Sequence, residues 1–267
     1  MRITAEEIYR SMERIRSQAP VVHNITNYVV MNNTANALLA IGASPVMAHA
    51  LEEVEDMVDI ASALVINIGT LSEHWINGML KAARQAGKKG IPIILDPVGA
   101  GATSYRTKTA RVLLAAAAPA IIRGNASEIM ALYDDQSKTK GVDSAASSDQ
   151  AMNIAQKLSQ LHQCVVCVSG VVDYVIDRDK VVKIKNGHPM MSSVTGLGCT
   201  ASALCGAFAA VEKSSFTATV GAMAAMGVAG EMAAATAAGP GSMQMHFLDC
   251  LYRLSQDDLA RLLKLEV

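Results

Sequence analysis

The sequence has few aromatic residues and no excess of charge of one sign. Phe, Trp and Tyr make up 4% of its 267 residues, and the formal net charge is −1. A core must therefore be built mainly from Ala, Val, Ile, Leu and Met. The apolar fraction of the whole sequence, 51%, is ample for such a core. The near-neutral charge and the scattered basic residues give no electrostatic reason to expect a nucleic acid or an anionic membrane as partner.

Long apolar runs are missing as well. The first residues, Met1 to Glu7, are charged and lack the apolar stretch of a signal peptide, so we expect none. The longest weakly polar run, 216–230, stops at Glu231 and is too short to span a bilayer. The cysteines show no disulfide-framework spacing, which indicates reduced thiols and a cytoplasmic protein.

Several motifs of common enzyme classes are absent. Without GxxxxGK[ST] the chain is not a Walker NTPase, and it has neither a GxSxG elbow nor an HExxH pair. Residues 196–201 match the dinucleotide fingerprint GxGxxA, but they lie late in the chain and follow no clear apolar strand. Cys164 and Cys167 have CxxC spacing, but on a strand they face opposite sides, so we interpret them as core thiols.

Apolar strands alternate with helices along most of the chain. Strands are predicted at 20–24, 45–48, 63–68, 91–95, 120–122 and 164–168, and helices at 4–17, 28–41, 54–61, 72–85, 108–117, 127–133 and 150–161. This alternation is typical of βαβ units, so we expect an α/β fold with a mostly parallel sheet and helices on both faces.

The remaining segments complete that prediction. Residues 134–149 indicate a surface loop, and 173–177 with 180–185 an edge hairpin that turns at Arg178 and Asp179. Beyond Cys199 the pattern is helical almost to the end, with a break near 239–241. No repeat or linker divides the chain, and we expect one domain over residues 1–267.

Polar residues follow the ends of several predicted strands. They are His23-Asn24, Asn67-Ile68-Gly69-Thr70, Asp96-Pro97-Val98-Gly99, Arg123-Gly124-Asn125 and Ser169-Gly170. In a parallel sheet these ends lie along one edge, and ligands of open α/β folds bind outside that edge. This convergence indicates a ligand site there.

Two carboxylates and one guanidinium stand out among these residues. Asp96 and Glu128 suit Mg²⁺, which prefers hard oxygen ligands and is often shared with substrate phosphates. The alternatives are a turn residue at Asp96 and a capping box that Glu128 forms with Asn125. Arg123 leaves a buried strand and needs an anionic partner, either a nucleotide phosphate or an internal carboxylate.

Residues 192–202 combine glycines with the start of an Ala-rich helix, which we place at Cys199 or Thr200. The free N–H groups of such a helix start, together with the helix dipole, favour an anion. A cysteine there could have a lowered pKa and accept a proton. The alternative is a glycine turn that leads into a core helix, with Cys199 as a small buried thiol.

Taken together, these blocks resemble the hydroxyethylthiazole kinase family over nearly the whole chain. The resemblance is carried by 23–27, 44–47, 67–71, 96–101, Arg123-Gly124-Asn125-Ala126-Ser127-Glu128-Ile129 and Val194-Thr195-Gly196-Leu197-Gly198-Cys199. It implies a ribokinase-like three-layer α/β/α fold without a separate lid domain, and a homotrimer with active sites between subunits. The implied reaction is Mg·ATP-dependent phosphorylation of the primary alcohol of 4-methyl-5-(2-hydroxyethyl)thiazole in thiamine salvage.

The same resemblance implies roles for individual residues. By matching position these are thiazole contacts at Met47 and Gly196, ATP contacts at Arg123 and Ser169, the magnesium region at Asp96 and Glu128, and Cys199 where the wider fold has an aspartate base. The chain departs from the family at Leu197, where Thr is usual, at Asn24, where Cys is frequent, and at Ser169, where Thr is frequent. Substrate identity is therefore less firmly implied than reaction class.

Other functions remain open at this point. Another kinase of this fold could act on a hydroxymethylpyrimidine or a similar small alcohol. A nucleotide-repair dehydratase would favour an aspartate at the position of Cys199, so the cysteine argues against it. A non-catalytic nucleotide-binding protein would keep the predicted metal residues and the glycine-containing helix start without turning ATP over.

Overall fold

A nine-stranded sheet runs through the computed structural model, which describes residues 3–133 and 146–267. The strand order is β2-β1-β3-β4-β5-β6-β7-β8-β9. The pairs from β2 to β6 are parallel and those from β6 to β9 antiparallel. The strands are β1 Val21–Ile25, β2 Ser44–Val46, β3 Ala63–Asn67, β4 Ile93–Asp96, β5 Ile121–Asn125, β6 Val165–Ser169, β7 Asp173–Asp177, β8 Lys180–Ile184 and β9 Leu265–Glu266.

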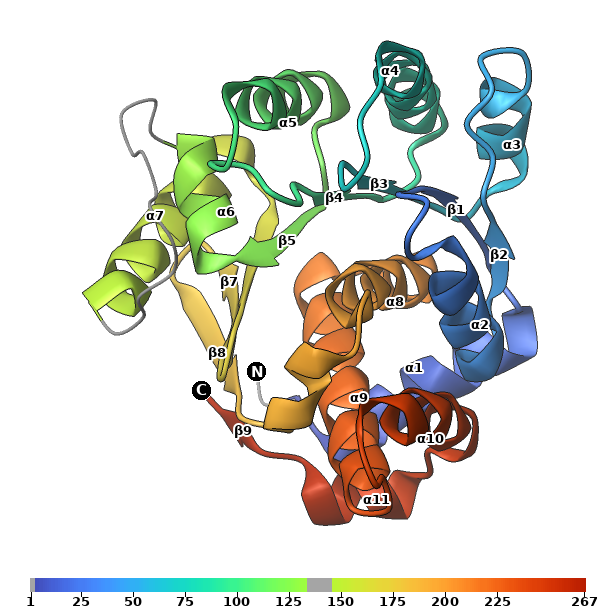
Figure 1. Cartoon of the computed structure of the whole chain (residues 1–267), viewed down its shortest axis with the longest axis vertical. Coiled ribbons are helices and arrows are strands. Elements are labelled where there is room, and N and C mark those ends of the chain that lie inside the picture. Colours follow the sequence, from blue (N-terminus) through green and yellow to red (C-terminus); the bar gives the residue numbers. More distant parts are fainter. Residues whose placement is uncertain (1–2, 134–145) are drawn as a thin grey trace.

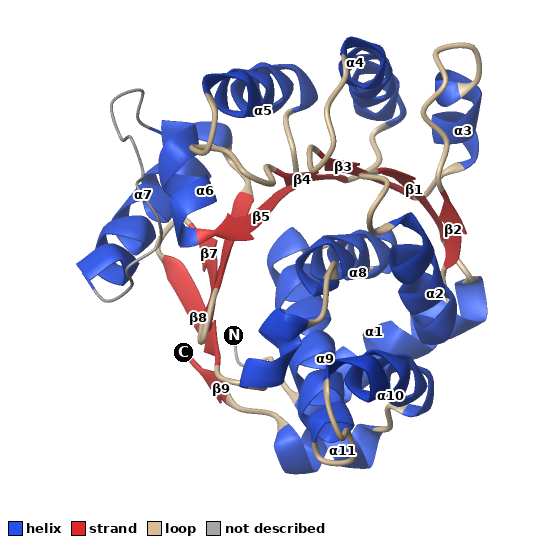
Figure 2. Ribbon diagram, viewed as in Figure 1, coloured by secondary structure: helices blue, strands red, loops and turns tan. Residues whose placement is uncertain are grey.

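Helices cover both faces of this curved sheet (Figures 1 and 2). The outer face carries α3 Val54–Ile60, α4 Glu73–Lys89, α5 Ser104–Ala117, α6 Ala126–Tyr133 and α7 Ala146–His162. On the inner face lie α1 Ala5–Gln18, α2 Met31–Ile41, α8 Leu197–Val211, α9 Ser215–Ala234, α10 Pro240–Arg253 and α11 Gln256–Leu262. A short 3-10 helix, η1 Pro189–Ser193, leads into α8.

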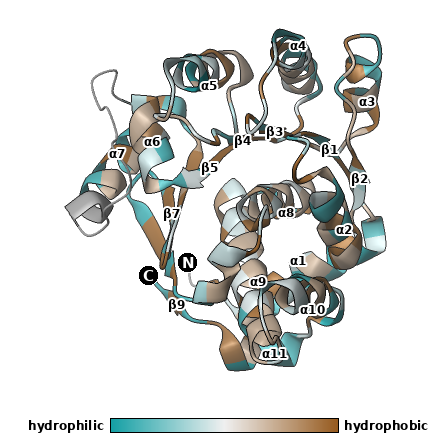
Figure 3. Ribbon diagram, in the orientation of Figure 1, coloured by the Kyte–Doolittle hydropathy of each residue, from teal (hydrophilic) through white to brown (hydrophobic). Residues whose placement is uncertain are grey.

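Side-chain alternation along each strand builds two cores. On β3, Ala63 and Val65 pack with the inner helices, whereas Leu64 and Ile66 pack with the outer ones. All four side chains are buried, because a parallel sheet covered on both faces has no polar side. Figure 3 shows the resulting apolar colouring of the central strands between the two helical layers. The same alternation puts Cys164 and Cys167 in different cores, which confirms that they face opposite sides.

Helix α8 lies close to the sheet because one of its faces carries small residues at four-residue spacing. A Cβ atom on Gly206 would lie 2.7 Å from Cγ2 of Val65 and 3.0 Å from Cγ1 of Val22. One turn earlier, Ser202 donates a hydrogen bond of 2.7 Å to the carboxylate of Asp96. A further turn back, a Cβ on Gly198 would lie 3.0 Å from Nη1 of Arg123. The absence of side-chain bulk therefore sets the helix–sheet distance.

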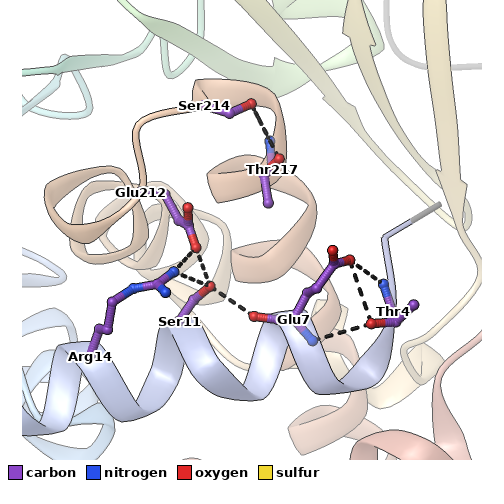
Figure 4. Close-up of polar contacts among 7 residues, drawn as sticks. All are labelled: Thr4, Glu7, Ser11, Arg14, Glu212, Ser214 and Thr217. Carbon is purple, nitrogen blue, oxygen red and sulfur yellow. Dashed lines mark hydrogen bonds and ion pairs between the residues drawn. The ribbon is translucent and has the colours of Figure 1, made fainter. Parts of the chain in front are cut away.

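The far end of α8 is held by α1 (Figure 4). Glu212, the C-cap residue of α8, accepts hydrogen bonds from Ser11 and Arg14 of α1. Helix α1 itself starts with a capping box, in which Thr4 and Glu7 satisfy each other's backbone N–H groups. Helix α8 is thus restrained at both ends.

The predicted alternation of strands and helices is confirmed, but several boundaries differ for local reasons. Helix α2 begins at Met31 rather than residue 28, because residues 28–30 form a turn. Helix α5 begins four residues earlier than predicted, since the side chain of Thr103 accepts the N–H of Arg106 as an N-cap. Helix α4 continues to Lys89, where Gly90 ends it in the left-handed region at φ 77°.

Further differences concern the ends of β5 and the C-terminal part. Strand β5 extends to Asn125, so Arg123 lies within the strand rather than after it. The C-terminal part is not one interrupted helix, because Ser214 and Ser255 cap the new helices α9 and α11. Of the predicted loop 134–149, residues 134–145 lie outside the described residues, and 146–149 already belong to α7.

Within residues 3–133 and 146–267, one helix, α9, is long and apolar enough to cross a membrane by length and composition. With 20 residues it exceeds the run of 216–230 that the sequence indicated. However, 78% of its most apolar window is buried inside the structure. It packs with α8 and α10 in the inner core, so it behaves as a core helix.

The close approach of α8 can be tested by adding one methyl group. Gly206→Ala should lower the free energy of unfolding by about 1–3 kcal/mol, because the new Cβ overlaps two core valines. The control is Gly87→Ala in α4, where nothing lies within 4 Å of an added Cβ, and helix propensity should raise stability by up to about 1 kcal/mol. Urea unfolding measures both, and a Gly206→Ala variant as stable as the parent would contradict this packing.

Candidate active site at the carboxyl edge of the sheet

A row of polar side chains crosses the inner face of the sheet where the parallel strands end. Asn67 pairs in register with Asp96, and the pairing of Leu95 with Ile122 places Asp96 beside Arg123. Each of these residues lies two positions after one that belongs to the inner core, so its side chain points towards α8. The predicted convergence at the carboxyl edge is therefore confirmed for this face.

Asp96 is fully buried in the middle of the row. Its Oδ2 accepts hydrogen bonds from Asn67 Nδ2 at 2.8 Å and from Ser202 Oγ at 2.7 Å. Within the described residues, its Oδ1 has no partner. Burial raises the pKa of Asp96 to about 6, while Arg123 opposes that rise. The carboxylate is thus held by neutral donors and keeps one oxygen for a ligand.

Arg123 occupies the next position of the row. Its Nη2 donates a 2.6 Å hydrogen bond to Ser169 Oγ, which brings the two predicted nucleotide residues together. Burial opposes its charge, but nearby anionic groups, Asp96 first among them, outweigh this and raise the pKa of Arg123. Since Nε has no partner among the described residues, the internal carboxylates do not exhaust its donors. A further anion fits this guanidinium.

Glu128 joins the loop after β4 to the start of α6. Its Oε2 accepts the N–H of Asn125, and Asn125 Oδ1 accepts the N–H of Glu128 in return. This is the capping box that the sequence left open as an alternative. The second oxygen, Oε1, accepts the N–H of Gly99 at 2.8 Å. Both carboxylate oxygens are therefore engaged by the backbone, so a contact of Glu128 with a metal ion would run through water.

Sequence reasoning missed Arg106, which joins the loops after β3 and β4. Its guanidinium donates to the carbonyl oxygens of Ile68 at 2.7 Å, Val98 at 2.9 Å and Gly69 at 2.9 Å. No motif signals this role, because the acceptors are backbone carbonyls and do not depend on side-chain identity. The contact fixes the two loops that carry the ends of the polar row.

Cys199 lies in the first turn of α8, which begins at Leu197, two or three residues before the predicted start at Cys199 or Thr200. Its sulfur accepts a 3.5 Å hydrogen bond from Nδ2 of Asn27, which also donates to Asn67 Oδ1. A lowered pKa, one of the sequence expectations, is wrong. Burial and the nearby charge of Asp96 raise the pKa of the Cys199 thiol to about 11. The helix start cannot compensate for that loss of solvation, and the residue is a thiol at neutral pH.

The start of α8 offers backbone donors beside Arg123. The first intrahelical bond runs from the N–H of Thr200 to the carbonyl of Gly196, so the N–H groups of 197–199 precede the hydrogen-bond ladder. Gly196 is the N-cap residue at φ 88°, and a Cβ there would lie 2.7 Å from Cγ1 of Val30. The two alternatives of the sequence analysis therefore do not exclude each other. A glycine turn leads into a core helix, and the first N–H groups of that helix remain available to an anion.

A cavity of about 590 Å³ opens beside the start of α8. Arg123, Ser169 and Gly198 line one end, and Met223 and Met226 of α9 line another part. Its walls thus combine a cationic end with an apolar surface, a combination that suits a phosphorylated ligand with an apolar ring.

The two predicted thiazole residues lie outside this cavity. Met47 directly follows β2 and is half-buried. Near it in the chain, the ring of His49 lies 4.4 Å from that of Trp75, which in turn lies 4.8 Å from the exposed ring of Tyr28. Composition could not reveal this aromatic group, because its members are far apart in the sequence.

No group of three or more His, Cys, Asp or Glu side chains able to hold a metal occurs in residues 3–133 and 146–267. The predicted pair, Asp96 and Glu128, is brought to the same end of the sheet, where each acts on the charge of Arg123. A cation here would need ligands from a substrate in addition to the free Oδ1 of Asp96. This donor set fits a magnesium ion that arrives with phosphates.

Comparison with known proteins gives a consistent result. The family model described as "Hydroxyethylthiazole kinase family" matches residues 12–257. A hydroxyethylthiazole kinase of Syntrophus aciditrophicus is 59% identical over 266 residues, which is 99% of this chain and 98% of the relative. One of Vibrio parahaemolyticus is 52% identical over 262 residues, 98% of either chain.

Solved structures agree with these matches. A hydroxyethylthiazole kinase protein from Pyrococcus horikoshii OT3 superposes with a TM-score of 0.91 at 42% identity, covering 98% of both chains. The pyridoxal kinase of Staphylococcus aureus in complex with pyridoxal has a TM-score of 0.61 at 16% identity, covering 79% of this chain and 87% of its own. That second likeness concerns the fold alone. A ribokinase-like superfamily protein of Enterococcus faecalis also shares the fold, with a TM-score of 0.66 at 15% identity over 90% of this chain and 89% of its own, which agrees with the expected ribokinase-like fold.

The raised pKa of Cys199 predicts an unusual reactivity profile. Its alkylation by iodoacetamide should accelerate about tenfold per pH unit up to about pH 10, because only the thiolate reacts and the pKa is about 11. Peptide mass spectrometry at each pH measures this, with the denatured chain as the control that levels off near the ordinary thiol pKa. A rate that levels off below pH 9 in the folded protein would contradict the burial of this thiol.

Proposed function

The chain belongs to the hydroxyethylthiazole kinase family, and from this premise we propose that it transfers the γ-phosphoryl group of ATP to the primary alcohol of 4-methyl-5-(2-hydroxyethyl)thiazole in thiamine salvage. One observation of the structure carries the proposal. Arg123 and Ser169 are joined by a hydrogen bond and together line the cavity at the start of α8. At this place the free N–H groups at the start of α8 and the guanidinium of Arg123 can bind the same polyphosphate.

Phosphoryl transfer needs positioning and charge stabilisation more than covalent chemistry. In the proposed complex Arg123 and Ser169 bind the phosphates of ATP, while the N–H groups of residues 197–199 hold the transferred group as its charge shifts. Leu197 differs from the family's usual Thr but still supplies its backbone N–H. The backbone contacts to the phosphate are therefore kept despite this departure, whereas a hydroxyl contact from this position is lost.

Magnesium belongs to the proposal as the ion that accompanies ATP. Asp96 would hold it with its free Oδ1, and Glu128 through water, because both oxygens of Glu128 already accept backbone N–H groups. When bound, the ion would neutralise phosphate charge. The carboxylate of Asp96 needs no structural change for this role, since Asn67 and Ser202 already orient it.

The acceptor alcohol is proposed to lie between Cys199 and the segment of Met47, with Met47 and Gly196 in contact with its thiazole ring. Cys199 would orient the alcohol proton as a neutral thiol, with Asn27 fixing the sulfur. Because the Cys199 thiol is protonated at neutral pH, it cannot itself take up the proton of the alcohol, which implies modest turnover. A turnover unchanged by Cys199→Ala would exclude the residue from the chemistry.

The direct test is ADP release from Mg·ATP with and without the hydroxyethylthiazole alcohol. We expect ADP only when the alcohol is present, with a thiazole phosphate identified by mass. A hydroxymethylpyrimidine is the matched alternative acceptor. ADP release with the pyrimidine alone would transfer the proposal to that class of alcohol, and ATP binding without any turnover would leave only a nucleotide-binding protein.

We also propose a cytoplasmic homotrimer with active sites between subunits, as in the family that the sequence resembles. All five cysteines are free thiols, which suits a reducing compartment. Tyr28 and Val29, next to Asn27 at the candidate site, are 63% and 67% exposed, and a neighbouring subunit would cover such apolar side chains.

Sedimentation equilibrium should give three times the chain mass of 28.1 kDa, and a monomer that is active would contradict this assembly.

A further inference from the structure

Asp173 faces the cavity from the strand beside Ser169. In the antiparallel pair of β6 and β7, Val168 lies opposite Tyr174, so the next pair is Ser169 with Asp173. Val175 belongs to the inner core, and Asp173, two residues earlier on the same strand, points to the same side. The residue lines the cavity together with Arg123 and Ser169. The polar row of the sheet therefore continues one strand further than the sequence indicated.

One carboxylate oxygen of Asp173 is committed and the other is not. Oδ1 accepts the N–H of Gly170 at 3.0 Å, which closes the turn between β6 and β7. The structure gives Oδ2 no partner among the described residues. Burial raises the pKa of Asp173 to about 6, so the group is ionised at neutral pH and its second oxygen is a strong acceptor.

Two other polar side chains along the cavity are already engaged. Asn186 donates to Glu231 and to the carbonyl of Leu262, and its Oδ1 accepts the N–H of Lys264. Ser192 donates to the carbonyl of Pro189. Asp173 is the one acidic side chain among the described residues that line the cavity. A ligand that donates hydrogen bonds would meet this carboxylate.

The negative charge of Asp173 decides which part of a nucleotide can lie beside this residue. A carboxylate repels phosphates, so the triphosphate belongs with Arg123 and the start of α8. The apolar side chains of Met223 and Met226 suit a base. Between the phosphates and the base of any nucleotide lies the sugar, whose hydroxyl groups are donors. Carboxylates accept hydrogen bonds from ribose hydroxyls in dinucleotide-binding proteins for the same reason.

We propose that Asp173 binds the ribose hydroxyls of the nucleotide and makes the cavity selective for ribonucleoside over deoxyribonucleoside triphosphates. This rests on the proposed function, since it takes the cavity to be the ATP site. Asp173 then acts as a specificity residue that binds the donor substrate without taking part in phosphoryl transfer.

The test measures binding of ATP, 2′-deoxy-ATP and 3′-deoxy-ATP by calorimetry, with Mg²⁺ and without any acceptor alcohol. The parent protein should bind ATP on the order of tenfold more tightly than at least one of the deoxy nucleotides. Asp173→Asn keeps the oxygen that accepts the N–H of Gly170 but removes the free acceptor. This variant should bind ATP and the deoxy nucleotides equally, at the weaker affinity.

Asp177→Asn is the matched control, because Asp177 lies on the same strand outside the cavity and pairs with Lys180. It should keep the preference of the parent.

Equal binding of all three nucleotides to the parent would overturn the role of Asp173 while leaving the ATP site intact. Binding of inosine triphosphate to the parent and to Asp173→Asn is measured as a further comparison. If the parent prefers ATP over inosine triphosphate and the variant loses that preference while still discriminating against the deoxy forms, Asp173 contacts the base, which also overturns the proposal. If no nucleotide binds to the parent, the ATP site and the proposed function fail together.

Discussion

The contact between helix α8 and the sheet is the one on which the geometry of the candidate site depends. Gly206 lets the helix approach Val65, Ser202 binds Asp96, and Gly198 lies against Arg123. Because these residues recur every four positions, a single helix face meets both the apolar core and the polar row. The same approach brings the free N–H groups of the helix start to the guanidinium. A larger side chain at these positions would move the start of α8 away from the guanidinium of Arg123.

Charge balance is the second constraint, because buried charges are costly unless they are paired. Arg123 on β5 lies between Asp96 on β4 and Ser169 on β6, and Asp173 follows on β7, so the guanidinium has an acidic group on either side. Hydrogen bonds from neutral groups such as Asn67 and Gly170 hold the carboxylates in place without neutralising them. The site is therefore arranged to receive additional charge of both signs, which a nucleotide with its metal ion would bring.

Much of the fold and part of the site could be predicted from the sequence, because they depend on local signals. Apolar runs and their spacing predicted the parallel sheet, and the Asn125–Glu128 capping box follows from residue types three positions apart. The pKa of Cys199 could not be predicted, since burial by distant segments decides its direction. Arg106 and Asp173 were missed for a related reason: one binds backbone carbonyls, and the other reaches the cavity only through strand register.

The guanidinium of Arg106 has a consequence for how the edge of the sheet fluctuates. It binds the carbonyls of Ile68 and Gly69 after one strand and of Val98 after the next, so neither loop can open without breaking bonds that hold the other. The two loops should thus form one cooperative unit, whose amide hydrogens exchange with solvent together. In a kinase built this way, Asn67 and Asp96, the last residues of the two strands, would keep their relative positions while other parts of the sheet edge rearrange around a substrate.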